Sequence, residues 1–192
     1  MFKSKLRMAF YRFKYRKTVY KSSKVRNYFE YQILPFFSSE NRFQHILIVG
    51  IANFTQHYPL LFQQKKFVRT IDTNPSVARF SSAKIHIIDS IENIEKHIDH
   101  DSLDLVLMNG VYGWGLDSEN ALKKSLNNIH MVMKQEGVLV FGWNEMDKYD
   151  PLNIRSENYF GLFQQYLFKG ESEIKFPISR NPKHGVVSFF KK

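Results

Sequence analysis

The sequence contains no cysteine. This excludes a disulfide framework, a thiolate metal site and a cysteine nucleophile, and it is common in proteins of a reducing compartment. Long apolar runs are also missing. None approaches the roughly 20 residues that cross a bilayer, and the amino terminus lacks the apolar segment of a secretory signal. We therefore expect a cytoplasmic protein, either soluble or peripheral to a membrane.

Acidic residues are absent from the first 29 positions, which hold ten of the 28 lysines and arginines. The remaining 18 cations are matched by 18 acids, so the net charge of +10 arises from this first segment. A domain without net charge argues against a nucleic-acid groove across the whole fold, so nucleic acid is the less expected partner. We predict a basic helix and connector at residues 1–41, followed by one domain at residues 42–192.

Residues 2–21 have the pattern of a basic amphipathic helix rich in aromatic residues. Three interpretations stay open at this point. The apolar stripe could pack on the domain with the cations solvated, or the helix could lie on an anionic membrane surface. The segment could also serve organelle targeting or nucleic-acid binding. The apolar residues near helical spacing are Phe2, Leu6, Ala9, Phe10, Phe13 and Tyr20.

A βαβ unit is predicted between residues 45 and 72. One apolar strand ends at Gly50, a second at residues 67–71 ends on Asp72, and a crossover helix at residues 55–64 would connect them. The carboxyl ends of such strands face one crevice. There the first turn can admit a nucleotide-like ligand, and an acid after the second strand can accept its ribose hydroxyls. Asp72 is therefore the first candidate for a ligand-binding residue.

Strands and helices alternate through the rest of the chain. Asn74 and Pro75 predict the start of a helix, Asp117 or Ser118 caps another that ends at Gly137, and residues 28–41 resemble a connector. This alternation predicts an α/β, doubly wound, mostly parallel sheet with helices on both faces. Further strands are expected at residues 84–88, 102–109 and 138–141, a helical pattern at 159–167, and an antiparallel hairpin at 174–178 and 186–190.

In this pattern, residues 45–190 resemble the class I S-adenosylmethionine-dependent methyltransferases. That family has a Rossmann-like, seven-stranded sheet in the order three, two, one, four, five, seven, six, with strand seven antiparallel. The order and spacing of four places carry the resemblance. These are Gly50 with Ala52 and Asn53 in the glycine-rich motif, IDTNPSVA from Ile71, Asp89 with Ser90, and the stretch from Asp101 through Asn109 to MKQEGVLVFGWN at Met133.

The resemblance implies S-adenosylmethionine as the cofactor and assigns its contacts. The glycine-rich turn would approach the methionine part, and the strand-two acid would hold the ribose. The pair after strand three would meet the adenine edge, and the end of strand four would line the pocket below the sulfonium. The cofactor-binding residues expected in this way are Gly50, Ile51, Ala52, Asn53, Asp72, Thr73, Asp89, Ser90, Asn109 and Gly110.

Three positions depart from the family pattern. Ala52 and Phe54 stand where the second and third glycines are usual, and Ile48 stands where an acid often helps to fix the methionine amine. These differences keep open a second function: a catalytically degenerate methyltransferase-like module that binds a partner through its basic amino-terminal helix. A dinucleotide-dependent oxidoreductase fits the patterns of the fourth and fifth strands less well.

Methyl transfer needs an aligned acceptor and, for a hydroxyl, a group that accepts its proton. Asn109 is not followed by two prolines and an aromatic residue, the loop of enzymes of this family that methylate exocyclic or amide nitrogens. A small-molecule or glycan acceptor that reacts at oxygen is therefore favoured, and no metal-site spacing is present. Acceptor contacts are expected from Tyr112, Trp114, Trp143 and Asn144, with Glu145 or Asp147 as general base and His57, His130 and His184 as weaker alternatives.

Overall fold

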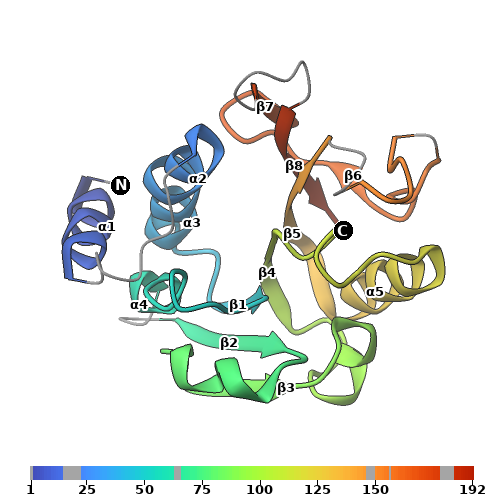
Figure 1. Cartoon of the computed structure of the whole chain (residues 1–192), viewed down its shortest axis with the longest axis horizontal. Coiled ribbons are helices and arrows are strands. Elements are labelled where there is room, and N and C mark those ends of the chain that lie inside the picture. The colour runs from blue at the N-terminus through green and yellow to red at the C-terminus, as the bar shows by residue number, and fades with distance from the viewer. Residues whose placement is uncertain (1, 15–22, 63–65, 146–149, 156, 178–183) are drawn as a thin grey trace.

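The structure is a computed structural model that describes residues 2–14, 23–62, 66–145, 150–155, 157–177 and 184–192. Within these residues one mixed sheet carries helices on both faces (Figure 1). The strands are β1 His45–Val49, β2 Phe67–Asp72, β3 Ile85–Ile88, β4 Leu103–Asn109, β5 Met133–Asn144, β6 Gln164–Gln165, β7 Glu173–Pro177 and β8 His184–Lys191. The helices are α1 Phe2–Lys14, α2 Lys24–Tyr28, the π-helix η1 Phe29–Ile33, α3 Leu34–Ser39, α4 Tyr58–Phe62, the 3-10 helices η2 Pro75–Phe80 and η3 Ile91–Lys96, and α5 Glu119–Val132.

The sheet has the strand order β3-β2-β1-β4-β5-β8-β6, with β7 also beside β8. The first five strands in this order are parallel to their neighbours, and β8 is antiparallel to β5. β7 pairs with the first part of β8, and the two-residue β6 pairs with its end. The predicted doubly wound, mostly parallel sheet is confirmed, with eight strands in place of seven.

Side chains of the parallel strands alternate between two cores, as buried strands require. In β1, Leu47 and Val49 lie in one core, whereas Ile46 and Ile48 lie in the other. α5 and η3 cover the first core, and α1, η1, α3 and α4 cover the second (Figure 1). The carboxyl ends of the strands stay uncovered between these layers, which is where a pocket can form.

Residues 28–41 are helical for most of their length, so the predicted connector is wrong. Phe29, Ile33 and Phe37 recur every fourth residue, and each is at most 1% exposed. Pro35 directly follows the π-helical turn η1, where Leu34 N donates to Phe29 O five residues earlier, so the proline lies at a point where the helical hydrogen-bond pattern already changes. The described part of residues 1–41 therefore belongs to the second core, and the division at residue 41 stays a prediction.

Helix α1 covers residues 2–14, while the remainder of the predicted helix, residues 15–21, lies outside the described residues. Met8 is fully buried against the body of the protein, but Leu6, Phe10 and Phe13 face outward. For these three residues the interpretation of a stripe packed on the domain is wrong. No helix in the described ranges is long and apolar enough to cross a bilayer.

Two helices predicted in the second half of the chain differ from the structure. Ser118 caps α5 by accepting a hydrogen bond from Ala121 N, but the helix ends at Val132 and not at Gly137. The intervening residues already belong to β5, where the pairing with β4 shifts register and Glu136 has a φ of 63°. Residues 159–167 form turns and β6, and Phe160 stacks on the ring of Phe190 in β8.

The crossover helix after β1 begins later than predicted. Residues 53–57 are turns, the helix α4 spans Tyr58–Phe62, and residues 63–65 lie outside the described part of the chain. The helix predicted after Asn74 exists as one short 3-10 stretch. Asn74 caps it as expected, because its side chain accepts a hydrogen bond from Ser76 N.

Candidate functional site

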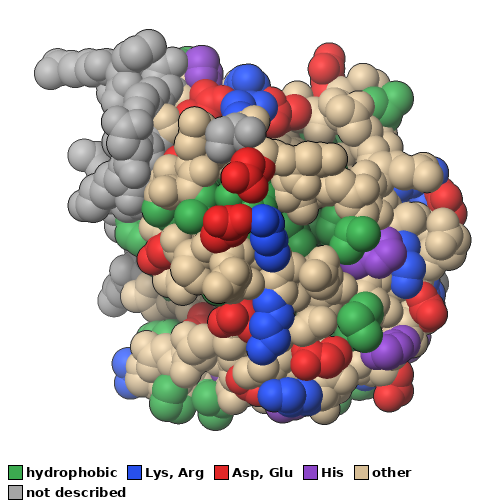
Figure 2. Space-filling model, turned by 90° about the vertical axis from the view of Figure 1, so that its right-hand side faces the viewer, with side chains coloured by type: hydrophobic (Ala, Val, Ile, Leu, Met, Phe, Trp, Pro, Cys, Tyr) green, Lys and Arg blue, Asp and Glu red, His purple; other side chains and the backbone are tan. Residues whose placement is uncertain are grey.

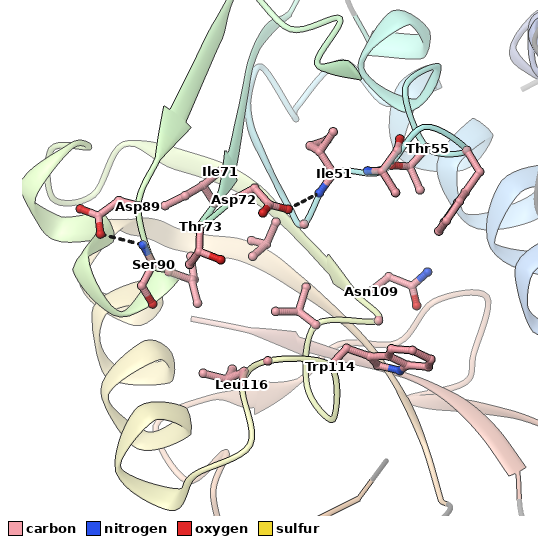
Figure 3. Close-up of a pocket in the computed structure, with 18 residues that line it drawn as sticks. Ile51, Thr55, Ile71, Asp72, Thr73, Asp89, Ser90, Asn109, Trp114 and Leu116 are labelled. Carbon is pink, nitrogen blue, oxygen red and sulfur yellow. Dashed lines mark hydrogen bonds between the residues drawn. The ribbon is translucent and has the colours of Figure 1, made fainter. Parts of the chain in front are cut away.

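An open pocket lies at the carboxyl ends of β1, β2 and β4 (Figure 3). Its empty volume, with the open mouth included, is about 790 Å³. Nine of the ten predicted cofactor residues line it, and so does Trp114. The lining residues are Val49, Gly50, Ile51, Ala52, Phe54, Thr55, Ile71, Asp72, Thr73, Asp89, Ser90, Ile91, Asn109, Gly110, Val111, Trp114, Gly115 and Leu116.

Gly50 makes the turn at the end of β1. Its φ is +80°, a left-handed conformation that side chains rarely adopt, and its N–H donates to Ile71 O across 2.9 Å. A Cβ at this position would also lie 2.9 Å from Val111 Cγ2. Glycine is therefore required here for two reasons: the backbone conformation, and the close approach of Val111 in the loop after β4.

Asp72 lies at the pocket wall, at the carboxyl end of β2. Its Oδ2 accepts from Ile51 N at 2.8 Å and its Oδ1 accepts from Asn74 N at 2.9 Å. A carboxylate has about four acceptor positions, so two remain for a ligand after these bonds. The acid thus fixes the first turn and offers lone pairs to hydroxyl groups in the pocket.

Asp89 and Ser90 occupy the far wall, but their side chains cap the start of η3. Asp89 accepts from Ser90 N and Asn93 Nδ2, and its second oxygen lies 2.7 Å from His97 Nε2. The hydrogen bond from Asn93, then those from His97 and Ser90, lower the pKa of Asp89 to about 2. The side chain of Ser90 bonds with Glu92. This capping role was not predicted from the sequence.

Asn109 ends β4 and its side chain packs against Gly142 of β5. A Cβ on Gly142 would lie only 1.8 Å from Asn109 Oδ1, so glycine leaves the space that this amide fills. Gly110 follows with a φ of +74° and open space around its missing Cβ. The chain therefore turns at Gly110, which adds no side chain to the pocket.

The loop at residues 111–116 places an aromatic face at the pocket mouth. Trp114 is 59% exposed between Gly113 and Gly115, which both have positive φ. Tyr112 is buried, and its hydroxyl donates to Asp150 Oδ1 at 2.5 Å and accepts from Leu152 N. Burial and this bond to Asp150 raise the pKa of Tyr112. Tyr112 thus anchors the loop and does not line the pocket.

The other predicted acceptor residues lie away from the pocket lining. Trp143 is 4% exposed, its Nε1 donates to Ser188, and Arg155 lies over its ring at 4.9 Å. Asn144 ends β5 beside Gly185 of β8, and Asn53 does not line the pocket either. Asp147 lies outside the described residues.

Glu145 follows β5 within an ion cluster. Its carboxylate contacts Arg155 at 2.9 Å, His184 at 3.0 Å and Lys175 at 3.6 Å. Burial acts to raise the pKa of Glu145, but the hydrogen bonds from His184 and Arg155 and the charge of Lys175 outweigh it, so the pKa is lowered. A carboxylate held in this way is a weak base.

Several pocket residues were not predicted. Ile91 and Leu116 are buried apolar residues that line the pocket. A signal existed for Ile91, since it directly follows Asp89 and Ser90. Phe54 lines the opposite wall with Arg26 4.4 Å above its ring. Thr55 closes the first turn by accepting from Ala52 N.

His57 and His130 are the remaining titratable candidates. His57 is buried beside Tyr58, and burial followed by the charges of Arg12 and Arg26 lowers its pKa to about 4. His130 lies in α5 with its ring against Phe163. Neither lines the pocket. Within the described ranges, no group of three His, Cys, Asp or Glu residues could hold a metal ion.

The fold of this chain matches those of known proteins, although its sequence does not. No protein-family model and no curated protein matches the sequence. Solved structures do match it. The N-methyltransferase NodS from Bradyrhizobium japonicum WM9 in complex with S-adenosyl-L-homocysteine is 11% identical with a TM-score of 0.64, over 93% of this chain and 96% of that one.

Two further matches have the same architecture. An arsenic(III) S-adenosylmethionine methyltransferase from Chlamydomonas reinhardtii is 12% identical with a TM-score of 0.61, over 98% of this chain and 72% of that one. A TehB-like SAM-dependent methyltransferase from Corynebacterium glutamicum is 17% identical with a TM-score of 0.55, over 82% and 84% of the two chains. The resemblance seen in the sequence is confirmed at the level of structure: this chain has the fold of the class I S-adenosylmethionine-dependent methyltransferases.

Proposed function

We propose that this protein binds S-adenosylmethionine and transfers its methyl group to a small-molecule or glycan acceptor at oxygen. The observation that carries the proposal is the position of Asp72, a carboxylate at the wall of an open pocket where the strands of a methyltransferase fold end. S-adenosylmethionine supplies an electrophilic methyl group. Few protein groups are needed beyond those that bind and align the two reactants.

The residues of the pocket fit such a cofactor. Asp72 has lone pairs left for two ribose hydroxyls, and the absence of side chains at Gly50 and Gly110 lets a ligand approach the backbone closely. Ile91 and Leu116 offer apolar surface to a planar base. Phe54, which stands at a position that is usually glycine in the family, forms part of the wall and leaves the pocket open.

The similar solved structures include an N-methyltransferase and an arsenic(III) methyltransferase, so they do not indicate an oxygen acceptor. The proposed acceptor is therefore argued from the loops of this chain. Trp114 presents an exposed aromatic face at the mouth, which suits the apolar face of a sugar or an aromatic ring. Glu145 and Asp147 stay the proposed bases. Because the pKa of Glu145 is lowered, we propose that an acceptor hydroxyl of low pKa, such as a phenol, needs the least help from it.

Isothermal titration of the full chain with S-adenosylhomocysteine tests the cofactor. We expect measurable binding by the parent and a loss of about tenfold to hundredfold in affinity for Asp72→Asn, which keeps the shape but removes the charge that strengthens ribose hydrogen bonds. Asp99→Asn is the matched control, since Asp99 is exposed and lies outside the pocket lining. Its affinity should equal that of the parent.

No heat from the parent at roughly millimolar ligand would contradict cofactor binding and favour the degenerate binding module. Once binding is shown, release of S-adenosylhomocysteine in the presence of phenols, sugars or amines identifies the acceptor class. Turnover with amines alone would contradict the assignment to oxygen.

A further inference from the structure

Helix α1 is the outermost element on its side of the molecule (Figure 1), where it packs against η1, α3 and α4. Met8 and Ser4 face the protein and are at most 9% exposed. Leu6, Phe10 and Phe13 are 56%, 60% and 67% exposed. These three residues, here called the outer stripe, follow each other by four and three positions and so share one face of the helix.

This orientation reverses the usual arrangement of a surface helix, whose apolar face turns toward the core. Single exposed apolar side chains are common, but several on one continuous face indicate an interaction surface. The outer stripe combines two aromatic rings with a leucine on one rigid element. It is therefore a candidate surface for a partner with an apolar interior.

Cations border the outer stripe. At about 3.6 residues per turn, Lys3 and Lys14 lie beside Phe10 around the helix, and Arg7 is next to them. Lys3 and Lys14 are exposed, and no acidic residue occurs before Glu30 in the sequence. Lysine stems of this kind lie along apolar surface while the ammonium group reaches polar surroundings. Figure 2, in contrast, shows acidic and basic side chains interspersed on the opposite face of the molecule.

Contacts on the inner face hold α1 in this orientation. Arg12 forms a salt bridge of 2.8 Å with the buried Glu30 and donates to Asn27 at 2.9 Å. Lys5 donates to Gln32 at 3.2 Å. Lys5 and Arg12 therefore bond within the protein, and Lys3 and Lys14 are exposed on the side of the outer stripe.

We propose that the outer stripe and its bordering lysines dock this protein on an anionic lipid bilayer, with α1 lying in the plane of the membrane surface. Phe10, Phe13 and Leu6 would enter the boundary between headgroups and acyl chains, and the lysines would contact anionic headgroups. Nucleic acid would satisfy the cations but offers no apolar layer for the whole stripe. The proposal is independent of methyl transfer.

Flotation of the full chain with lipid vesicles tests this docking. We expect binding to phosphatidylcholine vesicles that contain about 30% phosphatidylserine and much weaker binding to pure phosphatidylcholine. Phe10→Ser with Phe13→Ser should lower the vesicle partition coefficient at least about tenfold, since two half-exposed rings lose their transfer into the interface. Lys3→Gln with Lys14→Gln should weaken binding only to the anionic vesicles, and added salt should do the same.

Leu162→Ser with Leu167→Ser is the matched control, because these leucines are 54% and 60% exposed outside α1. Its partition coefficient and the unfolding temperatures of all three variants should equal those of the parent. Equal binding to neutral and anionic vesicles, or unchanged binding by the Phe10–Phe13 variant, would overturn the proposal. Anisotropy with a single-stranded RNA is the competing measurement: tight RNA binding that displaces the vesicles and ignores the Phe10–Phe13 variant would assign the segment to nucleic acid.

Discussion

Asp72 and Asp89 follow adjacent strands, yet their carboxylates have different surroundings. Asp72 accepts hydrogen bonds from the backbone N–H groups of Ile51 and Asn74, and two of its acceptor positions remain for a ligand. Asp89 is bound by Ser90, Asn93 and His97 of its own turn. A ligand at this wall would therefore compete with the cap for the oxygens of Asp89. We infer that Asp72 contributes more to ligand affinity than Asp89.

The glycines of the pocket give a prediction that separates backbone strain from steric contact. Gly50→Ala and Gly110→Ala both force alanine into a positive φ, which costs roughly 1–2 kcal/mol. Only Gly50→Ala also brings a Cβ to 2.9 Å from Val111. We expect Gly110→Ala to lower the free energy of unfolding by about 1–2 kcal/mol and Gly50→Ala by about 2–4 kcal/mol, measured in urea. Equal losses would contradict the close approach of Val111.

The sequence indicated those pocket residues that stand at the end of an apolar strand. Gly50, Asp72 and Asn109 stand at such ends, and parallel strands bring their carboxyl ends to one crevice. It could not show that Tyr112 turns inward while Trp114 turns out. That choice depends on Asp150, which is 38 residues away in the chain.

Among the elements, the loop at residues 111–116 is the one that shapes the pocket mouth. Gly113 N donates to Leu116 O, Trp114 N donates to Val111 O, and Tyr112 fixes the loop to Asp150. The loop is therefore a hydrogen-bonded turn that the hydroxyl of the buried Tyr112 connects to Asp150. The exposure of Trp114 follows from this anchor.

Removal of the anchor is predicted to loosen the loop without removing a ligand contact. Tyr112→Phe leaves the half-buried Asp150 and Leu152 N without this hydroxyl, which should lower the free energy of unfolding by about 1 kcal/mol. Asp150→Asn and the double variant complete a thermodynamic cycle, for which we expect a coupling of about 1 kcal/mol. Additive effects of the two substitutions would contradict the anchoring bond.

The predicted elements failed where tertiary contacts override local signals. Residues 28–41 carry proline and serines, which are typical of loops, yet the spacing of Phe29, Ile33 and Phe37 buries a helical face on the sheet. Residues 159–167 have a helical apolar pattern, but Phe160 stacks on Phe190 from β8 instead. Partners distant in sequence decide both cases, and a single sequence does not reveal them.

At the scale of the whole molecule, the order of the first five strands agrees with the order that the resemblance to class I methyltransferases implied. The two cores follow from the alternation of side chains in those strands. Glu30, Tyr58 and Arg12 form a polar cluster at the edge of the second core that the sequence did not predict. Burial raises the pKa of Glu30, which Arg12 and the hydroxyl of Tyr58 partly offset.

His57 lies near this cluster and gives the protein a pH-dependent stability. Its pKa falls from 6.5 to about 4 in the folded state, so protonation below 6.5 occurs first in the unfolded chain. The contribution of neutral His57 to the free energy of unfolding is fully present above pH 6.5. It is lost as the pH falls to about 4, and the total loss is up to about 3 kcal/mol. Glu30, whose pKa is raised above 4.5, acts in the opposite direction, because its contribution to stability falls as the pH rises above 4.5.

The measurement is the free energy of unfolding of the parent and of His57→Gln between pH 7 and pH 4. We expect a flatter profile for the variant over this range, and an unchanged profile for His100→Gln, because His100 is exposed. Identical slopes for the parent and His57→Gln would show that His57 is protonated equally in both states.

The pairing of β8 has a consequence for how copies of this chain meet in solution. Its outer side is occupied along its length, first by β7, then through Phe189 N to Ser172 O and Tyr166 N to Phe189 O, and finally by β6. The most apolar antiparallel strand therefore presents no unsatisfied ladder to a neighbouring molecule. We therefore expect that loss of the two-residue β6 would leave the end of β8 unpaired and open to strand addition from a neighbouring molecule.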